Sequence, residues 1–255
     1  HMLFIGTEKY PEVDAYQHFI AQNGGASNAY TAGDHTNYFF DIQPEYFPQA
    51  MDRFSQFFIS PLLAADYVER EKNAVNSEYQ MQLRSDDWRG MAVTSVAVNP
   101  KHPEARFSIG NLETLGAGVQ EALEDFFETE YSADQMVLVA LSNQPLDEME
   151  AWIAPMFSAV TNRNLGPAPE AEPLFTPGSL PLQLYYRTIK DGYKLSYSFP
   201  VPASHQYYRQ KPDQYISNLL GHEGEGSLFQ RLKREGWIES LAAGATDVDQ
   251  RTGLI

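Results

Sequence analysis

Two glutamates lie on one face of a predicted helix, where they could take part in acid-base or metal chemistry. The segment AADYVEREKNAVNSEYQMQL (64–83) places Val68, Glu71, Val75, Glu78 and Gln82 at three- and four-residue spacing. Glu71 and Glu78 are separated by about 20° around the helix axis and by roughly 10 Å along it. A carboxylate buried without a partner is costly, so each should be protonated, paired with a base or bound to a metal. The alternative is a solvent-exposed face on which the two valines are incidental.

A histidine at the first position is the other candidate for metal chemistry. The sequence opens with HMLFIGTEKYP, and imidazole is a common zinc ligand. His-Met is also a remnant that expression vectors leave at an N-terminus, so the residues alone leave both interpretations open. His18 and His35 have no partner at helical spacing, and we expect each to be a structural histidine.

Charge and composition exclude several classes of partner. The 255 residues include 18 basic and 34 acidic side chains, and the net charge of -16 argues against nucleic acid or an anionic membrane as the partner. There are no cysteines, so disulfides and thiolate metal sites are excluded. No apolar run approaches the roughly 20 residues that span a bilayer. We expect a soluble protein, and the compartment stays open between periplasm and cytoplasm.

The elements that must position these residues mix helices and strands without a strict βαβ order. The hydrophobic spacing predicts helices over 11–23, 45–58, 64–83, 119–130, 148–160, 211–220 and 226–235. It predicts strands over 35–42, 135–142, 182–188 and 193–199, the last two joined by a turn at Asp191-Gly192. This pattern favours an α+β fold with mainly antiparallel sheets flanked by helices.

A proline-rich stretch divides the chain. The sequence RNLGPAPEAEPLFTPGSLP holds five prolines, too many for regular secondary structure. We therefore predict an N-terminal domain over 1–165, a linker over 166–181 and the start of a second domain over 182–255. Both ends are abrupt, with no helix cap before LFIGT and an apolar pair after DQRTG, so we expect a fragment of a longer protein.

Five motifs together resemble the insulinase/pitrilysin family of zinc metallopeptidases. They occur in the family's order and are HMLFIGTEKYP, GGASNAYTAGDHTNYFFDI (24–42), EREKNAVNSEY (69–79), NPKHPEARFSIGNLETL (99–115) and LLGHEGEGSLFQRLKREGW (219–237). The resemblance implies two similar metallopeptidase-type domains, with the second incomplete here. Family members build an enclosed chamber from four homologous domains, so the remaining domains of the parent chain are implied as partners.

The family's zinc site is an inverted H-x-x-E-H motif on one helix, with a glutamate on a second helix as the third ligand. By resemblance, Glu78 is that zinc ligand, Glu71 is the nearby acid that supports catalysis, and His1 matches the second histidine of the motif. The first histidine and the general-base glutamate would then precede residue 1. We therefore expect this chain to bind zinc weakly or not at all and to be inactive alone.

Two further segments are implied as substrate contacts. Asn28, Ala29, Tyr30 and Thr31 would form an exposed strand edge that pairs with an extended peptide, and the alternative is an ordinary hairpin edge. Gly221 and His222 fall in a second-domain region that contacts the amino end of large substrates. Helix-capping glycines and a Ser227 N-cap also explain GHEGEGS.

The function implied is that of a zinc-dependent metalloendopeptidase, which degrades peptides and small unfolded proteins by metal-activated water attack. The alternative is a catalytically silent homologue that binds peptides or serves as a scaffold. The residues upstream of His1 separate the two, because the enzyme requires H-x-x-E directly before it. Retention of both Glu71 and Glu78 favours an active parent, since a silent scaffold has no need of acids on an apolar face.

Overall fold

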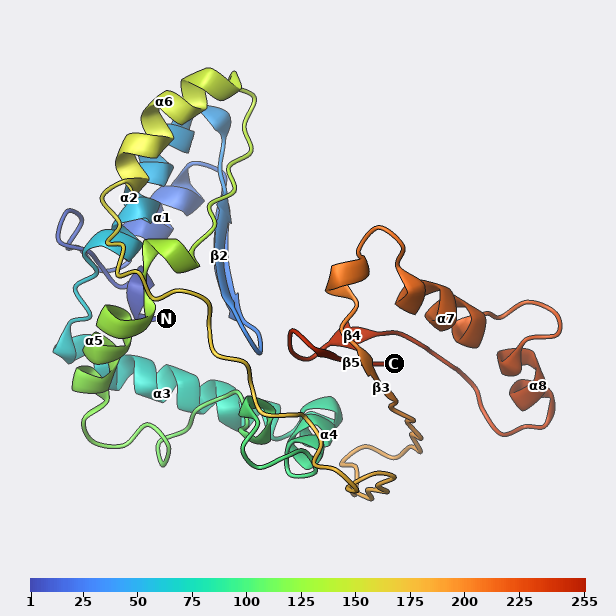
Figure 1. The fold of residues 1–255 in the computed structure, drawn as a ribbon. Coiled ribbons are helices and arrows are strands. Elements are labelled where there is room, and N and C mark those ends of the chain that lie inside the picture. The colour runs from blue at the N-terminus through green and yellow to red at the C-terminus, as the bar shows by residue number, and fades with distance from the viewer. The chain divides into compact units, whose positions relative to one another are not determined.

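The computed structural model describes all of residues 1–255 and divides into two compact units (Figure 1). Unit 1 consists of His1–Arg84 and Ser108–Pro169, and unit 2 consists of Ser85–Phe107 and Glu170–Ile255. The change of unit after Pro169 falls inside the proline-rich segment 166–181. Because 85–107 also belongs to unit 2, the domain boundaries drawn from the sequence stay a prediction.

Unit 1 combines helices with one β-hairpin. Strands β1 (Ala26–Thr31) and β2 (Thr36–Asp41) pair antiparallel, from Ala26 opposite Asp41 to Thr31 opposite Thr36. The other elements are η1 (Met2–Phe4), α1 (Ala15–Gln22), η2 (Pro44–Tyr46), α2 (Phe47–Ile59), α3 (Ala65–Gln82), α5 (Val119–Glu130), η4 (Ala133–Gln135) and α6 (Leu146–Phe157). Helix α2 packs against α1 and α6, and α1 packs against β1 (Figure 1).

The core of unit 1 is aromatic and centres on Phe57 of α2, which is 1% exposed. The centroid of its ring lies 4.7 Å from that of Tyr16 and 5.1 Å from that of Phe4. Helix α2 presents this face because Ala50, Phe54 and Phe57 recur at helical spacing. Edge-to-face packing of these rings therefore joins η1, α1 and α2.

The prediction of a buried strand over 135–142 is wrong. Residues 136–142 run between η4 and α6 without regular structure. Ala140 packs on the small cluster around Met149, but Val137, Val139 and Leu141 are 90%, 84% and 91% exposed. An apolar run becomes a strand only when its N–H and C=O groups find a neighbouring strand, and none pairs with this one.

Unit 2 carries a small antiparallel sheet in the order β3–β5–β4. Its strands are β3 (Pro200–Pro202), β4 (Thr246–Asp247) and β5 (Thr252–Leu254), with Gly253 of β5 opposite both Val201 and Asp247. The other elements are α4 (Asp86–Ser95), η3 (Pro103–Ala105), η5 (His205–Tyr207), α7 (Pro212–Gly221) and α8 (Leu228–Arg234). Helices α7 and α8 contact each other.

The strands predicted over 182–188 and 193–199 are also wrong, because residues 182–198 form no ladder. Phe199 exchanges backbone hydrogen bonds with Ile255 at 2.8 and 3.0 Å, next to the pairing of β3 with β5. The turn between them is instead held by the start of α4. Asp86 accepts hydrogen bonds from the backbone N–H groups of Ile189 (2.7 Å) and Lys190 (3.1 Å), and Lys194 donates to Asp87 (3.0 Å). Polar contacts with a helix therefore replace the expected hairpin pairing.

The architecture is α+β, with small antiparallel sheets flanked by helices, as the sequence predicts. The helix predictions are the most accurate part: α5 begins and ends at the predicted residues, and α2 and α3 differ from prediction by two residues or fewer at each end. No helix combines the length and the apolar character needed to cross a membrane.

A buried histidine joins the 99–107 segment of unit 2 to the β4–β5 turn. The side chain of His102 is 2% exposed, and its Nδ1 accepts the backbone N–H of Glu104 at 3.1 Å. Its Nε2 must then carry the hydrogen and donate to Asp249 Oδ2 at 3.0 Å. Burial pushes the pKa of Asp249 up, but the N–H groups of Arg251 and Thr252 and the imidazole of His102 outweigh it and hold that pKa below its ordinary value.

Unit 2 should therefore lose stability in acid through Asp249. A carboxyl with a lowered folded-state pKa stabilises the fold above its unfolded pKa, near 3.9, and loses that contribution as the pH falls through the folded pKa. We expect Asp249→Asn to cost about 1–3 kcal/mol near neutral pH and progressively less below about pH 4. Urea unfolding of both chains at several pH values, followed by circular dichroism, measures this difference.

A carboxylate without a partner provides the control for this titration. Glu225 of unit 2 is exposed and makes no hydrogen bond or ion pair, so Glu225→Gln should differ little from the unmodified chain at every pH. An Asp249→Asn deficit that stays constant from neutral to acid pH would contradict the assignment.

Candidate metal centre and peptide-binding edge

The face of α3 that carries the two glutamates is turned toward the body of unit 1. Val68 is 5% exposed, and Glu71, Val75, Glu78 and Gln82 are all partly buried. The residues of the opposite face are exposed, namely Glu69, Arg70, Asn73, Ala74 and Ser77. The solvent-exposed alternative for this face is therefore wrong.

The turn η1 places His1 beside this face. Met2 and Leu3 are 7% and 6% exposed and belong to the unit 1 core, and η1 contacts both α2 and α3. The backbone N–H of Phe4 donates to the carbonyl of His1 at 3.1 Å, which closes the turn. Two buried side chains directly after His1 thus hold the first residue against α3, although its own side chain is 54% exposed.

His1 and Glu71 are in direct contact. The Nδ1 atom of His1 lies 3.1 Å from Oε2 of Glu71, and the glutamate side chain is only 14% exposed. An ionised carboxylate can only accept hydrogen bonds, so Nδ1 carries the hydrogen in this pair. In a neutral imidazole this leaves the lone pair of Nε2 available, which is the state in which histidine binds a metal.

Glu78 lies two turns further along α3 and makes no hydrogen bond or ion pair. No three His, Cys, Asp or Glu side chains of the chain lie close enough together to hold a metal ion. Imidazole and carboxylate are suitable ligands for zinc, but a catalytic zinc needs about three protein ligands. The structure thus brings His1 and Glu71 together, while Glu78 shares their face without joining a cluster.

Two polar residues of α3 that the sequence analysis does not single out fix the position of the helix. Lys72 is paired with Glu69 at 2.8 Å and donates to the carbonyl of Gly116 at 3.3 Å. Asn76 accepts the backbone N–H of Leu112 at 3.3 Å. Lys72 and Asn76 are four residues apart, so they lie on the same side of α3 and hold it to the 110–116 loop. That spacing is the only sequence signal for their role.

The predicted peptide-binding residues form one strand of a two-stranded sheet. Strand β1 pairs only with β2, so one of its edges has no strand partner. Asn28 and Tyr30 are exposed on it, and the Asn28 side chain accepts the backbone N–H of Ala29 at 2.8 Å. His35 bonds to Asp34 at 2.8 Å, which supports a structural role for this histidine. An unpaired edge of this kind can accept an extended peptide as an added strand.

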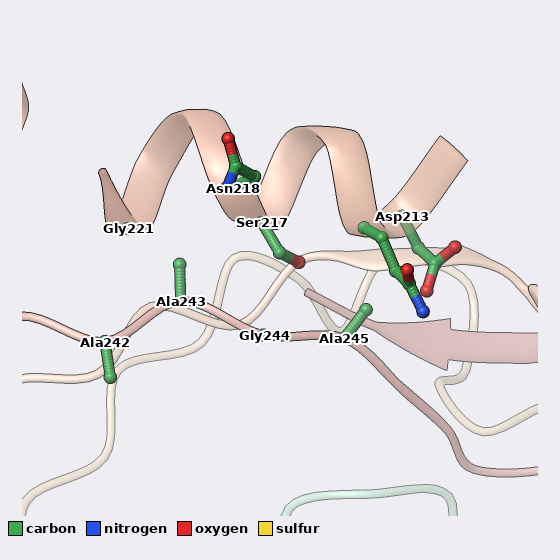
Figure 2. A pocket seen from close by; sticks show the side chains of 9 residues that line it. Asp213, Ser217, Asn218, Gly221, Ala242, Ala243, Gly244 and Ala245 are labelled. Carbon is green, nitrogen blue, oxygen red and sulfur yellow. The ribbon is translucent and has the colours of Figure 1, made fainter. Parts of the chain in front are cut away.

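Gly221 lines an open hollow of about 500 Å³ in unit 2 (Figure 2). The hollow lies between α7, which supplies Asp213, Ser217 and Asn218, and the segment 242–245. A Cβ atom at position 221 would lie 3.4 Å from the backbone N of Ala243, which is ordinary van der Waals contact. His222 directly follows α7 but does not line the hollow. Ser227 caps α8 by accepting the N–H of Gln230 at 3.1 Å, which confirms the capping interpretation of that residue.

Two models of known protein families match the chain. Residues 1–101 match the model described as Insulinase (Peptidase family M16), and residues 119–255 match the Peptidase M16 inactive domain. The chain belongs to the insulinase/pitrilysin M16 peptidase family. The resemblance carried by the five motifs is thereby confirmed, and His1, Glu71 and Glu78 all fall within the first M16 match.

Curated proteins from a plant and a yeast are similar to almost the whole of this chain. The identity is 42% over 252 residues to the peroxisomal Insulin-degrading enzyme-like 1 of Arabidopsis thaliana, covering 96% of this chain and 26% of that protein. It is 40% over 257 residues to the A-factor-processing enzyme of Saccharomyces cerevisiae, covering 98% and 25%. This M16 chain therefore spans about a quarter of the length of these relatives.

Two solved structures have a similar fold. Pitrilysin superimposes with a TM-score of 0.85 at 32% identity, covering 100% of this chain and 28% of pitrilysin. A protease from Helicobacter pylori superimposes with a TM-score of 0.72 and covers 100% of this chain and 62% of its own, but at 20% identity the likeness concerns the fold alone. The M16 fold found here therefore agrees with the α+β prediction.

Proposed function

We propose that this chain is part of a zinc-dependent metalloendopeptidase that degrades peptides and small unfolded proteins. The proposal depends on one observation, the contact between His1 and the mostly buried carboxylate of Glu71 on the α3 face that also carries Glu78. A buried acid needs a partner, and an imidazole from a distant part of the chain is a partner with metal-binding capacity. An apolar face with two acids has no evident structural purpose.

His1 and Glu78 would hold the zinc ion, and Glu71 would position His1. Glu71 keeps the hydrogen on Nδ1 and orients the ring, which makes Nε2 a better ligand. When bound, zinc polarises the peptide carbonyl and lowers the pKa of a water molecule. The third ligand and the general base would come from an H-x-x-E segment in front of His1, since residues 1–255 contain no H-x-x-E-H sequence.

The peptide would bind as an extended strand along β1, through Asn28, Ala29, Tyr30 and Thr31. The unpaired edge of β1 supports this, because backbone hydrogen bonds bind peptides with little demand on their sequence. The amino end of a large substrate would contact the surface at Gly221 and His222, where the open hollow supplies room. The names of the relatives, insulin-degrading and A-factor-processing enzymes, support peptides as the substrate class. The remaining domains of a longer chain would enclose the site.

The alternative is a catalytically silent M16 protein that only binds peptides or partner subunits. One observation favours it, namely that no set of three metal-binding side chains converges within residues 1–255. Against it, a silent scaffold gains nothing from a mostly buried Glu71 and a partly buried Glu78. The two proposals differ in whether a chain with H-x-x-E in front of His1 both binds zinc and cleaves peptide.

Zinc titration of two chains tests the proposal. The first is residues 1–255, and the second, the extended chain, adds a helical segment ending in His-Xaa-Xaa-Glu directly before His1. We expect the extended chain to bind one zinc ion tightly and residues 1–255 to bind zinc weakly or not at all, because about three protein ligands are needed. Isothermal titration gives affinity and stoichiometry, and a quenched fluorescent peptide reports cleavage.

Two results would overturn this proposal. An extended chain that binds no zinc would remove His1 and Glu78 as ligands. Stoichiometric, tight binding by residues 1–255 would show that another side chain completes the site. A zinc-loaded extended chain that binds peptide at β1 but never cleaves it would favour the silent alternative.

A further inference from the structure

The segment that follows His1 pairs with the linker between α2 and α3. Residues 6–8 run antiparallel to residues 60–62, both within unit 1. The contacts are a β-bridge and two backbone hydrogen bonds, namely Thr7 with Pro61, the Leu62 N–H to the Gly6 carbonyl (3.1 Å) and the Glu8 N–H to the Ser60 carbonyl (3.0 Å). Residues 60–62 lie shortly before α3, the helix that carries Glu71. This ladder, 6–8 with 60–62, therefore joins the chain after His1 to the chain before α3.

Few residues separate this ladder from the contact between His1 and Glu71. On one side lies the turn η1, in which Met2 and Leu3 are buried and the N–H of Ile5 donates to the carbonyl of Met2 at 3.1 Å. On the other side α3 follows as a regular helix. Both connections are short and held by packing or hydrogen bonds, whereas His1 and Glu71 are 70 positions apart along the chain. The ladder therefore sets the position of the imidazole relative to the carboxylate.

Gly6 has a backbone conformation that suits glycine. Its φ angle is +130°, a region in which any side chain is strained. A Cβ atom at this position would also lie 3.2 Å from the carbonyl oxygen of Pro11 and 3.5 Å from Cδ1 of Leu62. The first distance is tighter than ordinary van der Waals contact, and the atom it meets belongs to the backbone, which yields less easily than the end of a side chain. A methyl group at this position would therefore displace the ladder.

Thr7 fixes the turn that continues from the ladder. It is 2% exposed and exchanges two hydrogen bonds with Tyr10, because its N–H donates to the Tyr10 carbonyl at 3.1 Å and its Oγ1 accepts the Tyr10 N–H at 3.2 Å. The Tyr10 hydroxyl (2.5 Å) and the Lys9 ammonium (2.7 Å) both donate to Asp52 of α2. Loss of the Thr7 hydroxyl would leave the Tyr10 N–H without its acceptor and loosen the connection between the ladder and α2.

We propose that Gly6 and Thr7 are positioning residues that hold the imidazole of His1 against Glu71. The Nδ1–Oε2 distance is 3.1 Å, and a hydrogen bond is lost near 3.6 Å, so a shift of about 0.5 Å in the ladder is sufficient to break the contact. Both residues act through the backbone that leads to His1. The position of His1 follows from these contacts alone, whereas its use as a zinc ligand rests on the proposed function.

The tautomer of His1 tests this proposal without zinc. In contact with Glu71 the ring carries its hydrogen on Nδ1, and a ring without that partner is free to adopt the other tautomer. NMR of isotope-labelled histidines in residues 1–255, at about pH 8.5 and so above the ordinary histidine pKa near 6.5, measures both forms. A His1→Ala chain identifies the His1 signals. We expect Gly6→Ala to lower the ratio of the Nδ1–H to the Nε2–H form at least about fivefold, because a hydrogen bond to a charged group is lost.

Gly166 is the matched control for this change. It lies in unit 1 with a φ angle of +71°, and a Cβ atom there would meet open space, so Gly166→Ala adds the same methyl group without touching the ladder. The tautomer ratio should then stay that of the unmodified chain. Thr7→Val should also lower the ratio, and Thr7→Ser, which keeps the hydroxyl, should restore it. Circular dichroism checks folding, and the two Thr7 variants decide the question if Gly6→Ala does not fold.

Zinc titration of the extended chain applies the same variants to the metal. Gly6→Ala should lower the zinc affinity about tenfold, as expected when the support of a ligand is disturbed, and Gly166→Ala should leave it unchanged. An unchanged tautomer ratio in folded Gly6→Ala and Thr7→Val chains would overturn the proposal, as would an equal change in Gly166→Ala. A lowered ratio together with an extended chain that binds no zinc would support the positioning of His1 and refute only the proposed function.

Discussion

Replacement of Glu78 by glutamine should lower the zinc affinity of the extended chain by at least about a hundredfold. The amide has nearly the same size as the carboxylate but no charge, so the metal loses one of its three protein ligands while α3 keeps its shape. Second-sphere partners of a metal ligand are worth 10–100-fold in affinity, and a direct ligand should be worth more. Titration calorimetry and the measured zinc content of the purified protein give the result.

Two glutamates on the same helix are matched controls for this change. Glu71 contacts His1, so Glu71→Gln should cost an intermediate factor of about 10–100 in zinc affinity. Glu69 is 73% exposed on the opposite face and pairs with Lys72, so Glu69→Gln should leave zinc binding unchanged. Full zinc occupancy with unchanged affinity in the Glu78→Gln protein would refute the ligand assignment.

Phe57→Ala should destabilise unit 1 by about 3–5 kcal/mol. The side chain is 1% exposed and lies among the rings of Phe4, Tyr16, Phe54 and Phe58. Its removal loses apolar burial and leaves a cavity that surrounding aromatic side chains fill poorly. The fluorescence of Trp152, which packs on Phe47, reports urea unfolding of unit 1 when Trp88 and Trp237 are replaced by phenylalanine.

A second phenylalanine of unit 1 shows whether this effect comes from burial. Phe126 is 56% exposed, so Phe126→Ala should change the free energy of unfolding by less than about 1 kcal/mol. The same Phe57→Ala change should also loosen the contact between His1 and Glu71, because the Phe57 ring supports Phe4 in η1. Similar losses for the two variants would contradict the assignment of Phe57 to the centre of the core.

Much of the helical structure follows from local patterns. Helix α3 lies within the predicted 64–83 and turns Glu71 and Glu78 inward, as the placement of Val68 and Val75 indicates. A helix pairs its own backbone groups over four residues, so spacing along the chain is sufficient to identify it and its buried face. The motif order also predicts the M16 family, which both family matches bear out.

The strands could not be predicted equally well. The hairpin strand 36–41 lies within the predicted 35–42 because its partner β1 is adjacent in the sequence. Residues 135–142 and 182–198 have the composition of strands but no partner strand, and composition alone cannot supply one. The short strands β4 and β5 depend on residues outside their own segments, and no local pattern in the sequence predicts them.

Residue types and short spacings are sufficient to place Glu71 and Glu78 on one helix face and to predict the M16 family, and they suggest His1, Glu71 and Glu78 as candidates for a metal site. These properties depend on residue types and on short spacings along the chain, and both can be read directly from the sequence. The contact of His1 with Glu71, the separation of Glu78 from that pair and the hydrogen bond between His102 and Asp249 are visible only in the folded chain. Such contacts join residues far apart in the chain, and their formation depends on how aromatic cores and backbone pairings bring distant segments together.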